Sequence, residues 1–191
     1  MFRKRRLNAS KMRKIITILV VLFFSEKMAS QEMFSVDVFA DPKLAIMTDD
    51  YGNKPFTPNL LVNFSVQSKQ LESGYYFFGQ ALEYADLHGG KYFRYSVLQV
   101  GYTFNRIPIL SERIETSIAF NYGIVKRWSF DFANIGATMD LSYCVSDKIK
   151  FTSLLQFVRR TDIESPNDSI AIYRTSVFLG FRVNLSGINV I

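Results

Sequence analysis

Between residues 34 and 185 the chain alternates apolar residues with small or polar ones in eight segments. The last segment shows the pattern most clearly: apolar Val177 and Leu179 lie at odd positions of the sequence, while polar Ser176 and Arg182 lie at even positions. Successive side chains of a β-strand point to opposite faces, so such a segment has one apolar and one polar face. The pattern predicts an all-β chain of eight strands. They cover residues 34–47, 58–69, 75–86, 92–105, 113–124, 133–146, 149–160 and 171–185.

The links between these segments are short, and several carry turn residues such as Gly89-Gly90. None is long enough for a crossover helix, so neighbouring strands must pair antiparallel. An even number of antiparallel strands allows the first and the last to meet, and this closure removes both sheet edges. We therefore predict a single domain that forms an eight-stranded antiparallel up-and-down barrel.

The composition of the polar face indicates which way the barrel turns its apolar face. Gly123, Gly136 and Gly180 lie among Ser, Thr, Asn and charged residues, which suits a narrow and filled lumen. A solvated exterior is normally richer in Lys and Glu, as in a secreted lipocalin-like barrel that binds a small apolar ligand. We predict a transmembrane β-barrel whose apolar face contacts lipid, with the lipocalin-like binder as an alternative.

Two strands depart from the regular pattern. Asp41-Pro42 interrupts the first one, and proline is tolerated only at an edge, an end or a bulge of a sheet. In the fourth, Phe93, Tyr95 and Val97 are out of phase with the second half of the strand. This phase change indicates a bulge, or a strand end that stands clear of the membrane.

The first thirty residues have the composition of an export signal. Basic residues precede the apolar run 15–24, and small residues occur at Ala29 and Ser30. The apolar run is too short for a transmembrane helix, which needs about 20 residues. We predict a signal peptide at 1–30 that is cleaved off and a mature barrel domain at 31–191.

The formal net charge of +6 comes from the leader. From Gln31 onward, 15 basic and 16 acidic residues leave a formal charge of −1. No basic stripe remains in the mature chain, so we expect no nucleic-acid partner.

The last strand ends with a glycine followed by apolar residues at alternate positions, Gly180-Phe181-Arg182-Val183-Asn184-Leu185. This ending and the eight alternating segments resemble the small eight-stranded outer-membrane β-barrels of Gram-negative bacteria, the OmpA/OmpX-like class. The resemblance covers Phe34 to Leu185 and departs at Phe178, where a polar residue is usual. It implies an outer-membrane location, contacts with outer-membrane lipid and lipopolysaccharide, and insertion by the barrel-assembly machinery. It also implies a non-enzymatic envelope-structural or surface-interaction role through the extracellular loops, without identifying the extracellular partner.

Charged residues on the polar faces are predicted to lie inside the barrel. An eight-stranded barrel is just wide enough to be filled by its own side chains. Because buried charges are costly unless paired, we expect a cross-lumen network that fills and stiffens the barrel, with an ion path or acid–base site as the alternative. The expected members are Glu83, Arg94, Arg113, Glu115, Asp140, Lys150, Arg174 and Arg182.

The sequence offers little for catalysis or for a metal. His88 is the only histidine, and its spacing from Asp86 and Ser96 matches no nucleophile motif. Cys144 is the only cysteine, so no intrachain disulfide and no thiolate metal cluster can form. We expect no enzyme activity and no cofactor, with an outer-membrane lipid-modifying hydrolase as the alternative.

Two acidic loops remain as the candidate contact surface. With a periplasmic N-terminus, the first and last outward loops are the longest of the four that face outside. We expect them to contact a partner or cation-bridged lipopolysaccharide through Asp49, Asp50, Tyr51, Asp162, Glu164 and Asp168.

Overall fold

The computed structural model describes the chain in seven stretches, all within one unit, Glu32–Ile191. These stretches are residues 33–47, 53–68, 71–87, 90–104, 113–127, 130–159 and 173–185. The predicted signal peptide and the candidate contact residues of both acidic loops lie outside them. Among the described residues, no helix is both long and apolar enough to span a membrane.

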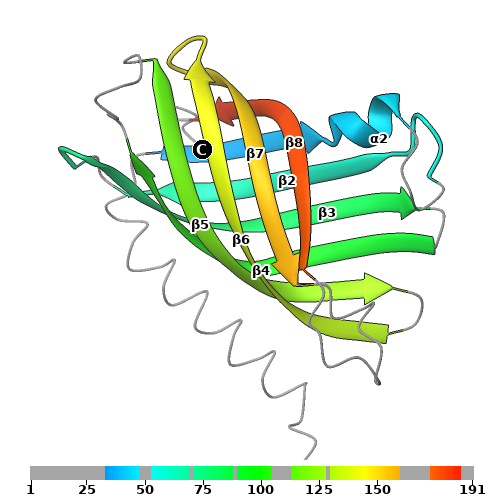
Figure 1. Cartoon of the computed structure of the whole chain (residues 1–191). Coiled ribbons are helices and arrows are strands. Elements are labelled where there is room, and N and C mark those ends of the chain that lie inside the picture. Colours follow the sequence, from blue (N-terminus) through cyan, green and yellow to red (C-terminus); the bar gives the residue numbers. More distant parts are fainter. Residues whose placement is uncertain are drawn as a thin grey trace, which may run out of the picture. The chain divides into compact units, whose positions relative to one another are not determined.

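The described strands form one closed barrel in which each strand pairs antiparallel with its neighbours in the sequence (Figure 1). The strands are β1 (Met33–Ala40), β2 (Asn59–Gln67), β3 (Gly74–Leu87), β4 (Gly90–Phe104), β5 (Ile114–Arg127), β6 (Phe130–Cys144), β7 (Ile149–Arg159) and β8 (Tyr173–Asn184). The predicted eight-stranded antiparallel up-and-down barrel is confirmed. We call the end at which β1 begins and β8 ends the near end, and the opposite end the far end.

The two faces of the wall differ as the alternation predicts. Outward side chains such as Phe120, Leu141 and Phe181 are 71, 48 and 53% exposed although they are apolar. Inward side chains such as Ser142 and Gln156 are buried although they are polar. The barrel therefore has an apolar exterior and a mainly polar interior.

A bulge in β4 explains the phase change of this strand. Ser96 pairs with Gly123 of β5 and Leu98 pairs with Tyr122, so Val97 is an extra residue in β4. The insertion moves the inward positions from even to odd numbers, and Arg94 and Gln99 are therefore both buried. Of the two explanations for the sequence pattern, the bulge is the correct one.

The first strand is shorter than predicted. It ends at Ala40 instead of continuing to residue 47, and a short helix, α2 (Pro42–Ile46), follows. The Asp41 carboxylate accepts hydrogen bonds from the backbone N–H groups of Lys43, at 2.9 Å, and Leu44, at 3.3 Å. A capping aspartate followed by proline at the first helical position favours a helix start, which the strand prediction did not take into account.

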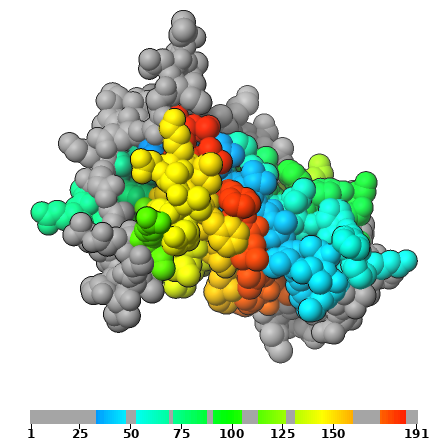
Figure 2. Space-filling view, turned by 90° about the horizontal axis from the view of Figure 1, so that it is seen from above, coloured from blue at the N-terminus to red at the C-terminus, as the bar shows by residue number. Residues whose placement is uncertain are grey.

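The pairing of β1 with β8 closes the barrel over a short register that runs from Ser35–Asn184 to Ala40–Leu179. Figure 2 shows the two ends of the sheet side by side, with blue residues of β1 and α2 next to orange and red residues of β8. Residues 173–178 of β8 pair with β7 and not with β1 within the described part of the chain, and α2 contacts β8.

A glycine makes this close pairing possible. A Cβ atom placed on Gly180 would lie 2.0 Å from the Val38 carbonyl oxygen and 2.7 Å from the Phe39 Cα atom. Both atoms belong to the backbone of β1, so no side-chain rotation can relieve the overlap. The ring of Phe39, directly opposite in the register, covers the space that a side chain would fill.

We expect Gly180→Ala to lower the free energy of unfolding by about 1–3 kcal/mol, because the added methyl group must push β1 away from β8. The measurement is the temperature at which the folded barrel in detergent loses its β-sheet circular dichroism and its compact migration on SDS gels. Ser176→Ala, on the same strand and face, is the control that adds no atoms. Equal unfolding temperatures for the two variants would contradict this view of the closure.

Candidate functional site

Charged and hydrogen-bonding side chains lie in the lumen of the barrel, in separate clusters along its axis. The cluster toward the far end is a buried ion pair. Arg94 Nε donates to Glu83 Oε2 at 2.9 Å, and both side chains are almost fully buried. Gln156 Nε2 donates to the same Glu83 oxygen at 3.0 Å, and Arg94 Nη1 donates to Asn121 Oδ1 at 3.2 Å. This cluster joins β3, β4, β5 and β7 and carries no net charge.

A second cluster lies toward the near end and joins β1, β6 and β8. Arg182 donates to both Asp37 carboxylate oxygens, from Nε at 2.9 Å and from Nη2 at 3.0 Å. The same Nη2 donates to Asp140 Oδ2 at 3.2 Å. Such a two-pronged arginine–carboxylate contact is among the stronger polar interactions in proteins, and here it spans the closing pair of strands.

Lys150 and Glu115 form a further ion pair at the near end. The Tyr75 hydroxyl donates to Glu115 Oε2 at 3.2 Å, and Cys144 Sγ lies 3.7 Å from Glu115 Oε1. The partly buried Cys144 is therefore a small neighbour of this pair, with a weak thiol contact to a carboxylate.

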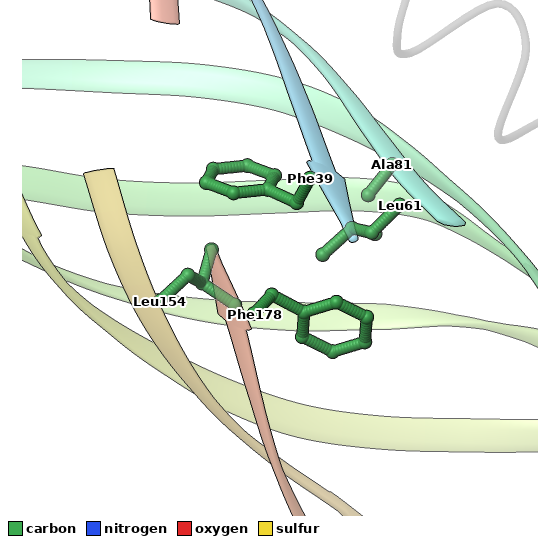
Figure 3. Packing of buried hydrophobic residues seen from close by; sticks show 5 residues of the cluster. All are labelled: Phe39, Leu61, Ala81, Leu154 and Phe178. Atoms are coloured by element: carbon green, nitrogen blue, oxygen red, sulfur yellow. The ribbon is translucent and has the colours of Figure 1, made fainter. Parts of the chain in front are cut away.

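An apolar cluster separates the ionic clusters on one side of the lumen. Five side chains from β1, β2, β3, β7 and β8 point inward and pack together (Figure 3), namely Phe39, Leu61, Ala81, Leu154 and Phe178. Along β1, Phe39 follows Asp37 of the near-end cluster, and along β3, Ala81 precedes Glu83 of the far-end cluster. The apolar side chains therefore form a layer between the two clusters.

The rest of the cross-section is also filled. On the opposite side of the lumen, Gln99 Nε2 lies 3.5 Å from Thr138 Oγ1, and both side chains are buried. Beyond the Glu83–Arg94 pair, a second apolar cluster of Ala85, Tyr92 and Val125 lies toward the far end. Ionic and apolar side chains therefore pack at successive levels along the described part of the lumen.

The structure brings most of the predicted lumen residues into these clusters, and two differ. The residues that lie inside are Glu83, Arg94, Glu115, Asp140, Lys150 and Arg182. Arg174, at a position of the inward parity of β8, is only half-buried. Arg113 was wrongly placed in the lumen: it is exposed, and its Nη1 lies 3.4 Å from the exposed Tyr143 hydroxyl. Arg113 lies directly before β5, at the near end of the barrel, where its long side chain reaches the exterior beside Tyr143.

Three participants were missed by sequence reasoning. Asp37 lies on the irregular first strand, to which no faces were assigned, although its parity matches that of the polar Ser35. Tyr75 lies near the start of β3, and its ring is buried in the lumen. Gln156 contacts Glu83 across 73 positions of the sequence, and no local pattern reveals such a contact.

The catalytic candidates of the sequence are not brought together within the described residues. Asp86 is exposed on β3 while Ser96 is buried in the lumen, so the two do not meet, and His88 lies outside the described residues. In the part of the chain that the structure describes, no group of three or more His, Cys, Asp or Glu side chains could hold a metal ion. The loop residues Asp49, Asp50, Tyr51, Asp162, Glu164 and Asp168 also lie outside the described residues.

The fold and the lumen together define the class of molecule, a small closed up-and-down β-barrel with an apolar exterior and a packed, polar interior. The chain is similar to the crystal structure of Neisserial surface protein A (NspA), with a TM-score of 0.45 and 10% sequence identity. The matched region covers 80% of this chain and 94% of that one. No protein-family model and no curated protein matches the sequence.

The buried Glu83–Arg94 pair gives a test of the packing inside the lumen. We expect Arg94→Met to lower the free energy of unfolding by about 3–5 kcal/mol, because it leaves the Glu83 carboxylate buried without its cation. Adding Glu83→Gln to this variant should restore part of the loss, since the neutral amide needs no counter-charge. Chemical unfolding of the folded barrel measures both values. A double variant less stable than the single one would show that the carboxylate does not depend on Arg94.

Proposed function

We propose that this chain is a non-enzymatic integral outer-membrane β-barrel protein. Its packed lumen is a structural plug, and the loops at one rim contact lipopolysaccharide or an extracellular partner. The observation that carries the proposal is the inversion of polarity across the wall. Buried positions hold Arg, Asp, Glu, Gln and Asn, while exposed positions hold Phe, Leu, Ile, Val and Met. This distribution is opposite to that of a soluble ligand-binding barrel, and it argues against the lipocalin-like alternative.

The exposed apolar side chains would form an unusually large patch in water. Monomeric soluble proteins rarely expose contiguous apolar surface beyond a few hundred square ångströms. Here exposed apolar residues occur on every described strand, for example Val38 on β1, Leu98 on β4 and Val177 on β8. A lipid bilayer accommodates such a surface, and closure of the sheet supplies backbone partners over most of the wall.

Aromatic residues near both strand ends support a membrane position. At the near end the rings of Tyr76, Tyr102 and Phe104 pack edge to face, with centroids 4.8 and 4.9 Å apart. Exposed aromatic residues also occur toward the far end, including Tyr84 and Tyr173. Aromatic girdles at the two interfaces of a bilayer are typical of transmembrane barrels.

The remaining parts of the proposal follow from this location. Transmembrane barrels of this size are typical of bacterial outer membranes, which a signal peptide at 1–30 and the barrel-assembly machinery would let the chain reach. With a periplasmic N-terminus, the far end faces outside and its acidic loops meet lipopolysaccharide or an extracellular partner. No cofactor is needed for such a role.

The membrane position is tested by placing arginine at two depths on one face of β6. Leu141→Arg puts the charge on the exterior within the strand, where it costs about 2–4 kcal/mol in a bilayer. Val145→Arg puts the same charge just beyond the strand end, where the cost is about 0–1 kcal/mol. Folding yield into lipid vesicles should fall strongly for the first variant and little for the second. Equal yields would contradict the assignment of this face to lipid.

The structural role is tested by reconstituting the folded barrel in planar bilayers and in phospholipid vesicles. The packed lumen predicts no large, stable single-channel conductance, and the separation of Asp86 from Ser96 predicts no lipid hydrolysis. A lipid hydrolysis that disappears with His88→Ala would instead support the hydrolase alternative. Stable conductance of the intact chain would move the function from the loops to the lumen.

A further inference from the structure

The near-end part of the lumen contains a small cavity with an unusual lining. Its volume is about 10 Å³, on the scale of one water molecule. Six strands contribute to its walls, and nine of its ten lining residues carry a polar group on their side chain. The residues used below are Asp37, Asn63, Gln67, Asp140 and Arg182, which all line it.

Two of the lining side chains have an oxygen without a hydrogen-bond partner. Asn63 and Gln67 are each only 4% exposed, and the carbonyl oxygens Asn63 Oδ1 and Gln67 Oε1 receive no donor. A buried acceptor without a partner is costly, so this geometry favours an occupant that either donates hydrogen bonds or carries positive charge.

The charge balance distinguishes between these occupants. Two carboxylates, Asp37 and Asp140, line the cavity, and both contact the Arg182 guanidinium that lines it as well. Glu115 and Lys150 do not line the cavity and form a balanced pair of their own at the same end of the barrel. The far-end pair Glu83–Arg94 is balanced, so one uncompensated negative charge remains at the near end. An unbalanced charge inside a barrel wall is expensive, and one further positive charge would remove the imbalance.

We propose that this cavity is a binding site for one small monovalent cation, with Asn63 Oδ1, Gln67 Oε1 and the Asp140 carboxylate as its principal ligands. Oxygen-only ligands suit a hard cation, and a single excess negative charge suits a monovalent one. Asp37 faces Asn63 in the β1–β2 register and Arg182 in the β1–β8 register. The bound ion therefore links β2 and β6 to β1 and β8, the pair of strands that closes the barrel.

Sodium is the probe, and the folded full-length mature chain in detergent micelles is the sample. Sodium chloride replaces N-methylglucamine chloride at constant ionic strength and constant pH while the unfolding temperature is recorded. We expect a saturable rise of about 2–6 °C, because a ligand that binds only the folded state stabilises it. No sodium-specific rise would overturn the proposal and would leave an ordered water or a bound proton as the occupant.

Asp140→Asn is the decisive variant, because it keeps the shape of the side chain and removes the excess charge. The sodium-dependent rise should disappear in this variant. Glu83→Gln makes the same chemical change in the balanced far-end pair and should keep the full rise whatever its own unfolding temperature. A full rise in Asp140→Asn, or its loss in Glu83→Gln, would contradict a site at this cavity.

A second variant covers the case in which Asp140→Asn does not fold. Gln67→Met has similar length and lacks the unpartnered oxygen. The sodium concentration that gives half of the stabilisation should increase at least about tenfold, which corresponds to about 1.4 kcal/mol of binding free energy. An unchanged half-saturating concentration would exclude Gln67 Oε1 as a ligand and overturn the site as proposed.

Discussion

The register between β1 and β8 is the constraint on which the rest of the structure depends. It places Asp37 opposite Arg182 and Phe39 opposite Gly180, so the closing hydrogen bonds, the ion pair and the close backbone approach form together. A slip by one residue would turn every side chain of β1 to the other face, placing Asp37 against the exterior and Val38 inside. The polar lumen and the apolar exterior both follow from this one alignment.

The wall of the barrel depends on the pairing of strands, and the interior depends equally on the pairing of charged side chains. Eight strands enclose just enough space for their own side chains, so every charge in the lumen must find a partner there. Ionic clusters alternate with apolar layers along the lumen, and their charged groups bind side chains that are close in space. For example, Gln156 donates a hydrogen bond to Glu83, and the Tyr75 hydroxyl donates one to Glu115. The result is a lumen in which charged and apolar side chains pack against one another across the described strands.

The sequence predicted the fold well because strand alternation is a local property. Each strand of the barrel reads as apolar outside and polar inside, and even the bulge at Val97 is visible as a change of phase. The side-chain contacts inside the lumen were predicted less completely, because which two side chains meet depends on the register between strands. Asp37 was missed on an irregular strand. Arg113 was misplaced because it lies directly before β5, where a long side chain can reach the exterior from a position of inward parity. Phe178 looked anomalous by sequence and proved to be part of the apolar layer with Phe39.

The central claim is that the apolar exterior lies in lipid, and spin labelling along β6 tests it most directly. After Cys144→Ser removes the native thiol, single cysteines at Met139, Leu141 and Val145 carry the label in barrels folded into vesicles. Collision with oxygen, which partitions into lipid, should be frequent at Met139 and Leu141, while a water-soluble nickel complex should reach only Val145. Free access of the nickel complex to Met139 and Leu141 would show that this face meets water and would contradict the account.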